Sequence, residues 1–96
     1  MSKLLAAAIG LASIAAAASA SAQPPPGAAA CSGCHPTSAR VTSPVVRLAG
    51  RDRDEIVRAL REFRAGTRTA TVMDRIAKGF TDEEIQALAA WFATQK

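Results

Sequence analysis

Two stretches in the second half of the chain repeat apolar positions with the period of an α-helix. In residues 52–65 the apolar side chains recur at i, i+1, i+4 and i+7, which places them on one helix face. This first stripe consists of Ile56, Val57, Leu60 and Phe63. The second stripe, in residues 81–94, consists of Ile85, Leu88, Ala89 and Phe92, with Trp91 on its flank. The pattern therefore predicts two amphipathic helices.

Capping residues predict where these two helices begin and end. Asp52 is the expected N-cap of the first helix, and Gly66 is the residue expected to follow its last turn. The second helix is expected to start with a capping box made by Thr81 and Glu84 and to run to about Thr94.

The remaining segments predict shorter elements and loops. Residues 23–27 form a Pro-rich lead-in to a domain expected over residues 28–96. Ala28–Cys34 predicts a short first helix that Pro36 ends, and Thr37–Leu48 reads as a loop. A short apolar and basic segment is expected at Asp74–Lys78, ended by Gly79. Because no strand pattern is convincing, we expect an all-α fold of three to four short helices.

The first 22 residues have the features of a secretory signal peptide. Lys3 supplies a positive charge, residues 4–18 are apolar, and Ala-x-Ala cleavage sites end at Ala20 and at Ala22. The apolar stretch is short and rich in alanine, which suits it poorly to spanning a bilayer. We expect cleavage and a periplasmic protein without stable membrane insertion; an uncleaved anchor is the alternative.

The expected mature chain is small and mildly basic. It has about 74 residues and contains three Phe, one Trp and no Tyr, so its own core is small. A domain with so small a core usually needs a disulfide, a metal or another bound group to stabilise it. The formal net charge of +4 falls to +3 when Lys3 is lost, and charges of both signs are interleaved. We expect no nucleic-acid binding, because no basic cluster with base-reading residues is present. The length excludes a two-domain protein, an α/β barrel or a Rossmann enzyme.

The pentapeptide Cys31-Ser32-Gly33-Cys34-His35 holds both cysteines of the chain. A disulfide inside Cys-x-x-Cys closes too small a loop to restrain much of a protein. The pattern C-x-x-C-H is instead the attachment signature of a c-type haem. Positions i, i+3 and i+4 share a helix face, so two thiols can bond to the haem vinyls while the imidazole binds the iron. We therefore expect one covalent haem c per chain.

Two other kinds of site, a redox thiol pair and a zinc site, also use cysteine and histidine and are alternative interpretations of the pentapeptide. A thioredoxin-like thiol pair requires a βαβ context, which the chain does not show. A zinc site requires four ligands, whereas two Cys and one His are available. Covalent haem is the preferred interpretation, and a haem-free thiol oxidoreductase using Cys31 and Cys34 is an alternative.

A haem iron bound by His35 has a second axial position, for which Met73 is the candidate. The mature chain has no second His, no Tyr and no other Met. A thioether ligand stabilises ferrous iron. Because Met73 follows a polar loop and lies outside the helical stripes, ligation is favoured over simple core filling. Two filled positions predict outer-sphere electron transfer; the alternative is a haem gas sensor or small haem enzyme with an open distal site.

These residues together resemble a class I c-type cytochrome. The resemblance rests on the pentapeptide, on Pro44 with residues 48–50, on Met73 and on the final helix at residues 88–92, and it covers about Ala28 to Gln95. Residues 71–85 further resemble the cytochrome subunit of flavocytochrome c sulfide dehydrogenase. The likeness implies a small class I cytochrome c fold in which the helices wrap around one covalently attached haem.

The resemblance also implies how the site is arranged. The N-terminal helix is expected to cross the C-terminal helix beside the haem, with Met73 on the distal side. The carbonyl of Pro44 is expected to accept the Nδ1–H of His35, which would fix the ring and its tautomer. A loop-stiffening role is the alternative for Pro44.

Departures from the family and the surface charges bear on the expected partners. Pro36 stands where the family commonly has glycine, and the single pentapeptide excludes the two-haem form of the subunit. We expect an electron carrier or electron-transfer subunit that docks on a flavoprotein sulfide dehydrogenase subunit, another cytochrome or an oxidase. Five basic residues are candidates for a rim that steers an acidic partner, with an ordinary solvated surface as the alternative. They are Arg40, Arg47, Arg68, Arg75 and Lys78.

Overall fold

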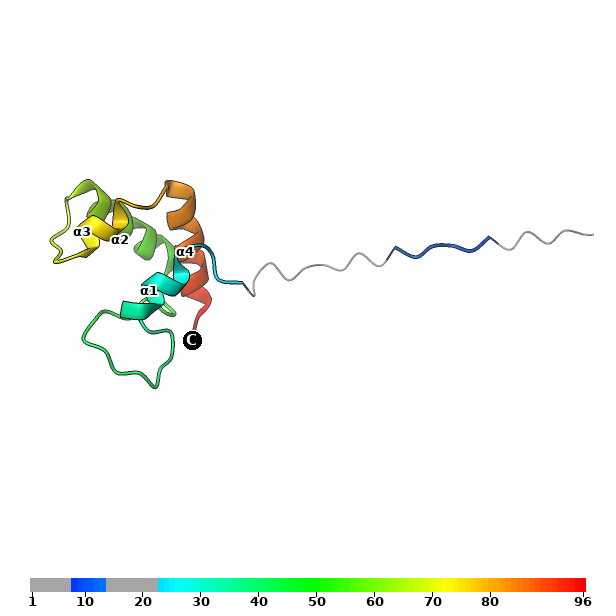
Figure 1. Ribbon diagram of the computed structural model, residues 1–96, viewed down its shortest axis with the longest axis horizontal. Helices are drawn as coiled ribbons and strands as arrows, with labels where there is room; N and C mark the ends of the chain where they lie inside the picture. The colour runs from blue at the N-terminus through cyan, green and yellow to red at the C-terminus, as the bar shows by residue number, and fades with distance from the viewer. Residues whose placement is uncertain (1–7, 14–22) are drawn as a thin grey trace, which may run out of the picture.

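The computed structural model describes residues 8–13 and 23–96, and the second range contains four α-helices. They are α1 (Ala28–Cys34), α2 (Arg53–Ala65), α3 (Met73–Ala77) and α4 (Asp82–Thr94). No strand forms in the described part of the chain, so the predicted all-α fold is confirmed. Figure 1 shows α1 against the C-terminal half of α4, with α2 and α3 on the other side of the bundle.

The predicted signal peptide and its cleavage sites lie outside the described residues, apart from residues 8–13. These six residues are exposed and form no regular structure. Among the described helices, none combines the length and apolar character needed to cross a membrane.

Helix α1 starts at a glycine whose backbone a side chain closely approaches. Gly27 is the N-cap and has φ +89°, in the left-handed region. A Cβ at this position would lie 2.6 Å from Cε1 of Phe80. At the other end, the backbone N–H of His35 donates to the carbonyl of Cys31, 2.8 Å away, and Pro36 follows. The predicted bounds of the first helix are confirmed.

Helices α2 and α4 have the predicted caps. The side chain of Asp52 accepts the backbone N–H of Glu55 at 3.0 Å, and Gly66 ends α2 with φ +77°. Thr81 and Glu84 form the predicted capping box at the start of α4. Each helix therefore begins and ends where its side chains and backbone satisfy the free polar groups of its terminal turns.

Helix α3 begins earlier than predicted. The short piece expected at 74–78 is a helix over Met73–Ala77, and Met73 is its first residue. The difference arises because a short helix without a side-chain N-cap leaves little sequence signal for its first residue. The Met73 side chain thus starts from the first turn of a helix instead of the preceding loop.

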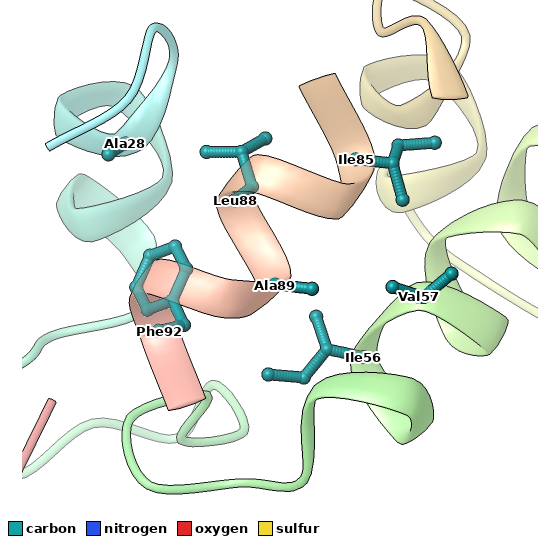
Figure 2. Packing of buried hydrophobic residues seen from close by; sticks show 7 residues of the cluster. All are labelled: Ala28, Ile56, Val57, Ile85, Leu88, Ala89 and Phe92. Atoms are coloured by element: carbon teal, nitrogen blue, oxygen red, sulfur yellow. The ribbon is translucent and has the colours of Figure 1, made fainter. Parts of the chain in front are cut away.

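The core is a single cluster centred on α4 (Figure 2). The predicted stripe of α4 is buried in it, with Ala28 of α1 on one side and Ile56 and Val57 of α2 on the other. The largest fully buried side chains are those of Phe92, Ile85 and Leu88. Trp91 packs edge-on against Phe92, with ring centroids 4.9 Å apart. α4 therefore fixes the positions of α1 and α2 relative to each other.

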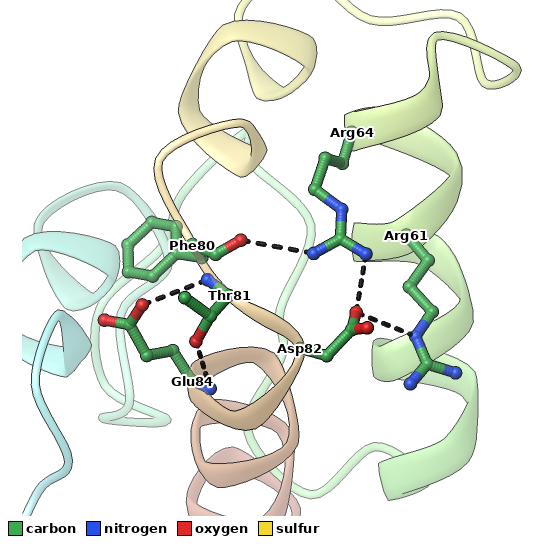
Figure 3. Close-up of polar contacts among 6 residues, drawn as sticks. All are labelled: Arg61, Arg64, Phe80, Thr81, Asp82 and Glu84. Atoms are coloured by element: carbon green, nitrogen blue, oxygen red, sulfur yellow. Dashed lines mark hydrogen bonds and ion pairs between the residues drawn. The ribbon is translucent and has the colours of Figure 1, made fainter.

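A polar network ties α2 to the start of α4 (Figure 3). The guanidinium of Arg64 donates to the carbonyl of Phe80 at 3.2 Å and to Oδ1 of Asp82 at 2.5 Å. Nε of Arg61 lies 3.5 Å from the same carboxylate oxygen. The hydrogen bond and charge of Arg64, together with Arg61, hold the pKa of Asp82 below its ordinary value.

Replacement of Gly27 by alanine is expected to destabilise the protein by about 1–3 kcal/mol, because the new methyl group meets the Phe80 ring and the backbone is left-handed. Gly66→Ala is the matched control: its φ is also positive, yet a Cβ at this position would meet no atom within 4 Å. It should cost only the backbone strain, about 1 kcal/mol. Denaturant unfolding measures both variants, and equal losses would contradict the close approach of Phe80.

Asp82→Asn is expected to destabilise the protein at neutral pH and to have a shrinking effect in acid. Because the folded pKa of Asp82 is lowered, its stabilisation is present above the unfolded pKa of about 3.9 and is lost as the pH falls through the folded pKa. The unfolding free energies of the two proteins, measured from pH 7 to pH 2, should therefore converge at the acid end. A difference independent of pH would rule out this ion pair as its source.

Candidate functional site

One cleft of about 180 Å³ lies between the end of α1, the loop that follows it, α2 and the start of α3. His35 and Met73 both line it, although they are 38 positions apart in the sequence. Most of its other lining side chains are apolar: Val46, Leu48, Ile56, Ala59, Leu60 and Phe63. The structure therefore brings an imidazole and a thioether to one largely apolar cavity.

The His35 ring is buried, with 7% of the residue exposed, and is oriented by a backbone carbonyl. Its Nδ1 lies 2.6 Å from the carbonyl oxygen of Val46. A carbonyl can only accept, so a neutral ring carries its proton on Nδ1 and keeps the lone pair of Nε2 free. This is the tautomer in which Nε2 can bind a metal.

The carbonyl that holds His35 is not the predicted one. We expected Pro44 to supply it, whereas the structure assigns it to Val46, two residues later. Pro44 itself is exposed. The loop over residues 36–48 has no regular period, so the sequence does not show which carbonyl its path brings back to the ring.

The two thiols lie on the last turns of α1, directly before His35. Cys31 is half-buried and packs against the core, whereas Cys34 is exposed. Neither forms a disulfide in the structure, and neither lines the cleft. Burial raises the pKa of the Cys31 thiol. A nucleophilic redox cysteine needs a lowered pKa instead, which counts against the thiol oxidoreductase alternative.

Three charged residues line the cleft, and of these only Arg68 was among the residues predicted to matter, as a candidate for the basic rim. Arg51 and Glu55 form an ion pair at 3.0 Å, and Arg68 pairs with Glu62 at 2.9 Å and lies over the Phe63 ring. The i, i+4 spacing of the first pair was a signal for pairing. No sequence pattern indicated that Arg51 and Glu55 would border the cavity.

The residues at the cleft suit a haem. The cavity offers an imidazole nitrogen and a thioether, the donors of a His/Met haem site, and apolar walls that match a porphyrin ring. The thiols of the attachment signature lie one and four residues before the imidazole.

Comparison with known proteins gives two relatives. The chain is 44% identical over 62 residues to the cytochrome subunit of sulfide dehydrogenase from Chlorobaculum tepidum, a match that covers 65% of this chain and 56% of the relative. It is 35% identical over 65 residues to cytochrome c-552 from Acidithiobacillus ferridurans, covering 68% of this chain and 28% of the relative. The chain thus spans about half of the first relative and less than a third of the second. No family model matches it.

Proposed function

We propose that this chain is a class I c-type cytochrome, an assignment that both relatives support. It transfers single electrons through one covalently bound haem c. Cys31 and Cys34 form the two thioether bonds, and His35 and Met73 are the axial ligands. The chain acts as an electron carrier or electron-transfer subunit and has no catalytic residues of its own.

One observation carries this proposal: His35 and Met73 line the same apolar cleft, although they come from different helix ends. A methionine that merely filled the core would not need to share a cavity with an imidazole whose Nδ1 meets a carbonyl and whose Nε2 is available as a ligand. The two relatives, whose names are both those of cytochromes, support the same assignment.

When bound, the haem supplies reversible one-electron chemistry at its iron. The chain's residues determine how that chemistry proceeds. Nε2 of His35 and the sulfur of Met73 would hold the iron, which would leave no site on the metal for a substrate and would favour the ferrous state. Leu48, Ile56 and Leu60 line the cleft and would exclude water from a haem held there. Arg51 and Arg68 are cations at the cleft that suit the propionate carboxylates.

The partner is a redox protein outside the cytoplasm, and a sulfide-oxidising flavoprotein is the specific candidate. The name of the Chlorobaculum relative, a subunit of sulfide dehydrogenase, supports that class of partner. The leader-like first 22 residues support export to the periplasm.

Met73→Ala is expected to remove the weak near-red absorption band that a thioether–iron bond gives to the ferric protein. It should also lower the midpoint potential, because the thioether no longer stabilises ferrous iron. The reduced α and β bands should remain, since the thioether bonds and His35 are unchanged. Val72→Ala, at the exposed neighbouring position, is the control and should retain the near-red band. Visible spectroscopy of both variants makes the comparison; a band that survives in Met73→Ala would exclude ligation by this residue.

Arg40, Arg75 and Lys78 are the members of the predicted rim whose side chains form neither an ion pair nor a hydrogen bond with the described residues; Arg68 pairs with Glu62, and Arg47 donates to two carbonyls. Arg40 lies on the loop that reaches the cleft at Val46, and the other two lie on or next to α3, which begins at Met73. Exchanging all three for Glu is expected to slow association with an acidic redox partner at low salt, with the difference vanishing at high salt.

The control for charge alone is Arg58→Glu, on the face of α2 that turns away from the cleft toward Gln86. Stopped-flow electron transfer as a function of ionic strength measures both proteins. Unchanged rates in the triple variant, or an equal effect per charge in Arg58→Glu, would remove the steering role of the rim.

A further inference from the structure

In the loop over residues 36–48, Leu48 packs against the core, but the three valines before it are exposed, so the path of the loop up to Val46 needs another means of support. Val41, Val45 and Val46 are 54%, 39% and 51% exposed. Packing of these side chains therefore contributes little to fixing the path of the loop. Yet the carbonyl of Val46 lies 2.6 Å from Nδ1 of His35, which requires that path to be well defined.

The guanidinium of Arg47 closes this loop. Nη2 donates to the carbonyl of Thr37 at 3.0 Å, and Nη1 donates to the carbonyl of Ser38 at 3.2 Å. Its planar fork thus spans two successive carbonyls directly after the His35-Pro36 pair. The residue is half-buried, so these bonds compete with solvent less than fully exposed ones would.

The backbone of Arg47 is held as well. Its carbonyl accepts from Nε of Arg51 at 2.7 Å, and the N–H of Arg51 donates to the carbonyl of Leu48 at 3.0 Å. Val46, whose carbonyl contacts His35, is the residue directly before Arg47. Side chain and backbone of Arg47 therefore fix the one peptide group that faces the imidazole.

We propose that Arg47 is a positioning residue for His35: it closes the loop and so holds the Val46 carbonyl on Nδ1–H. The inference rests on the proposed function, in which Nε2 of the same ring binds the haem iron. A carbonyl that accepts the Nδ1 proton fixes the ring orientation and raises the basicity of the ligand. A more basic imidazole favours ferric iron, so Arg47 lowers the midpoint potential through this contact.

The positioning role of Arg47 and the effect of its positive charge move the midpoint potential of the iron in opposite directions. A cation favours the ferrous form, because reduction removes one positive charge from the metal. Loss of charge alone therefore lowers the midpoint potential, whereas loss of the carbonyl contact raises it. Arg40 provides the matched control: it lies on the same loop, is exposed, and makes no side-chain hydrogen bond with the described residues.

The experiment compares Arg47→Leu with Arg40→Leu in the haem-loaded protein. Exchange of the His35 Nδ1–H with deuterium, followed by NMR, should be about tenfold faster in Arg47→Leu, the factor expected for one lost hydrogen bond. It should be unchanged in Arg40→Leu. The midpoint potential should fall slightly in Arg40→Leu, which loses only the charge, and should be higher in Arg47→Leu than in Arg40→Leu, because the lost carbonyl contact opposes that fall.

Arg47→Lys keeps the charge and loses the planar fork, so it extends the test should Arg47→Leu not fold. Its exchange rate is expected between those of the wild type and Arg47→Leu; a wild-type rate would overturn the proposal. Equal exchange rates and equal downward potential shifts in Arg47→Leu and Arg40→Leu would overturn it too. A wild-type protein without a haem spectrum would instead overturn the proposed function.

Discussion

The packing of α4 against both α1 and α2 is the interaction on which the rest of the structure depends. Phe92, Ile85 and Leu88 are its largest buried side chains, and each buried side chain of this kind stabilises the fold by about 1.5–3 kcal/mol. Ala28 and Ile56 meet α4 from opposite sides. α1 carries the pentapeptide and α2 forms one wall of the cleft, so this packing sets the distance between the attachment helix and that wall. The remaining core consists largely of alanines, which is little for a domain of this size.

A small core on one side of α2 and an apolar cleft on the other have one common explanation. Ile56 belongs to both the core cluster and the cleft lining, and Leu60 and Phe63 continue the same helix stripe into the cavity. A haem in that cavity would cover these side chains and supply the burial that the chain lacks. A haem there would also have suitable iron ligands in the half-buried thioether of Met73 and in Nε2 of the buried His35.

The sequence predicted the features that local chemistry determines. The two long helices follow from their stripes and caps, and their bounds were right because Asp52, Gly66 and Thr81 have one favoured place in a helix. The features that depend on the path of a loop were not predictable. The carbonyl that contacts Nδ1 of His35 belongs to Val46 and not to Pro44. We expected Arg47 on a basic rim, whereas its side chain donates hydrogen bonds to carbonyls of its own loop. The contact between Gly27 and Phe80 joins residues 53 positions apart without a pattern that pairs them. The roles of Cys31, Cys34, His35 and Met73 stay predictions.

The central claim is that the pentapeptide holds a haem covalently, and the mass of the intact exported protein tests it most directly. After denaturation and removal of free haem, the wild type is expected to exceed the mass of its cleaved chain by that of one haem. The variant in which Cys31 and Cys34 are both replaced by serine is expected to have the mass of the chain alone. A wild-type protein with the mass of the bare polypeptide would contradict the account.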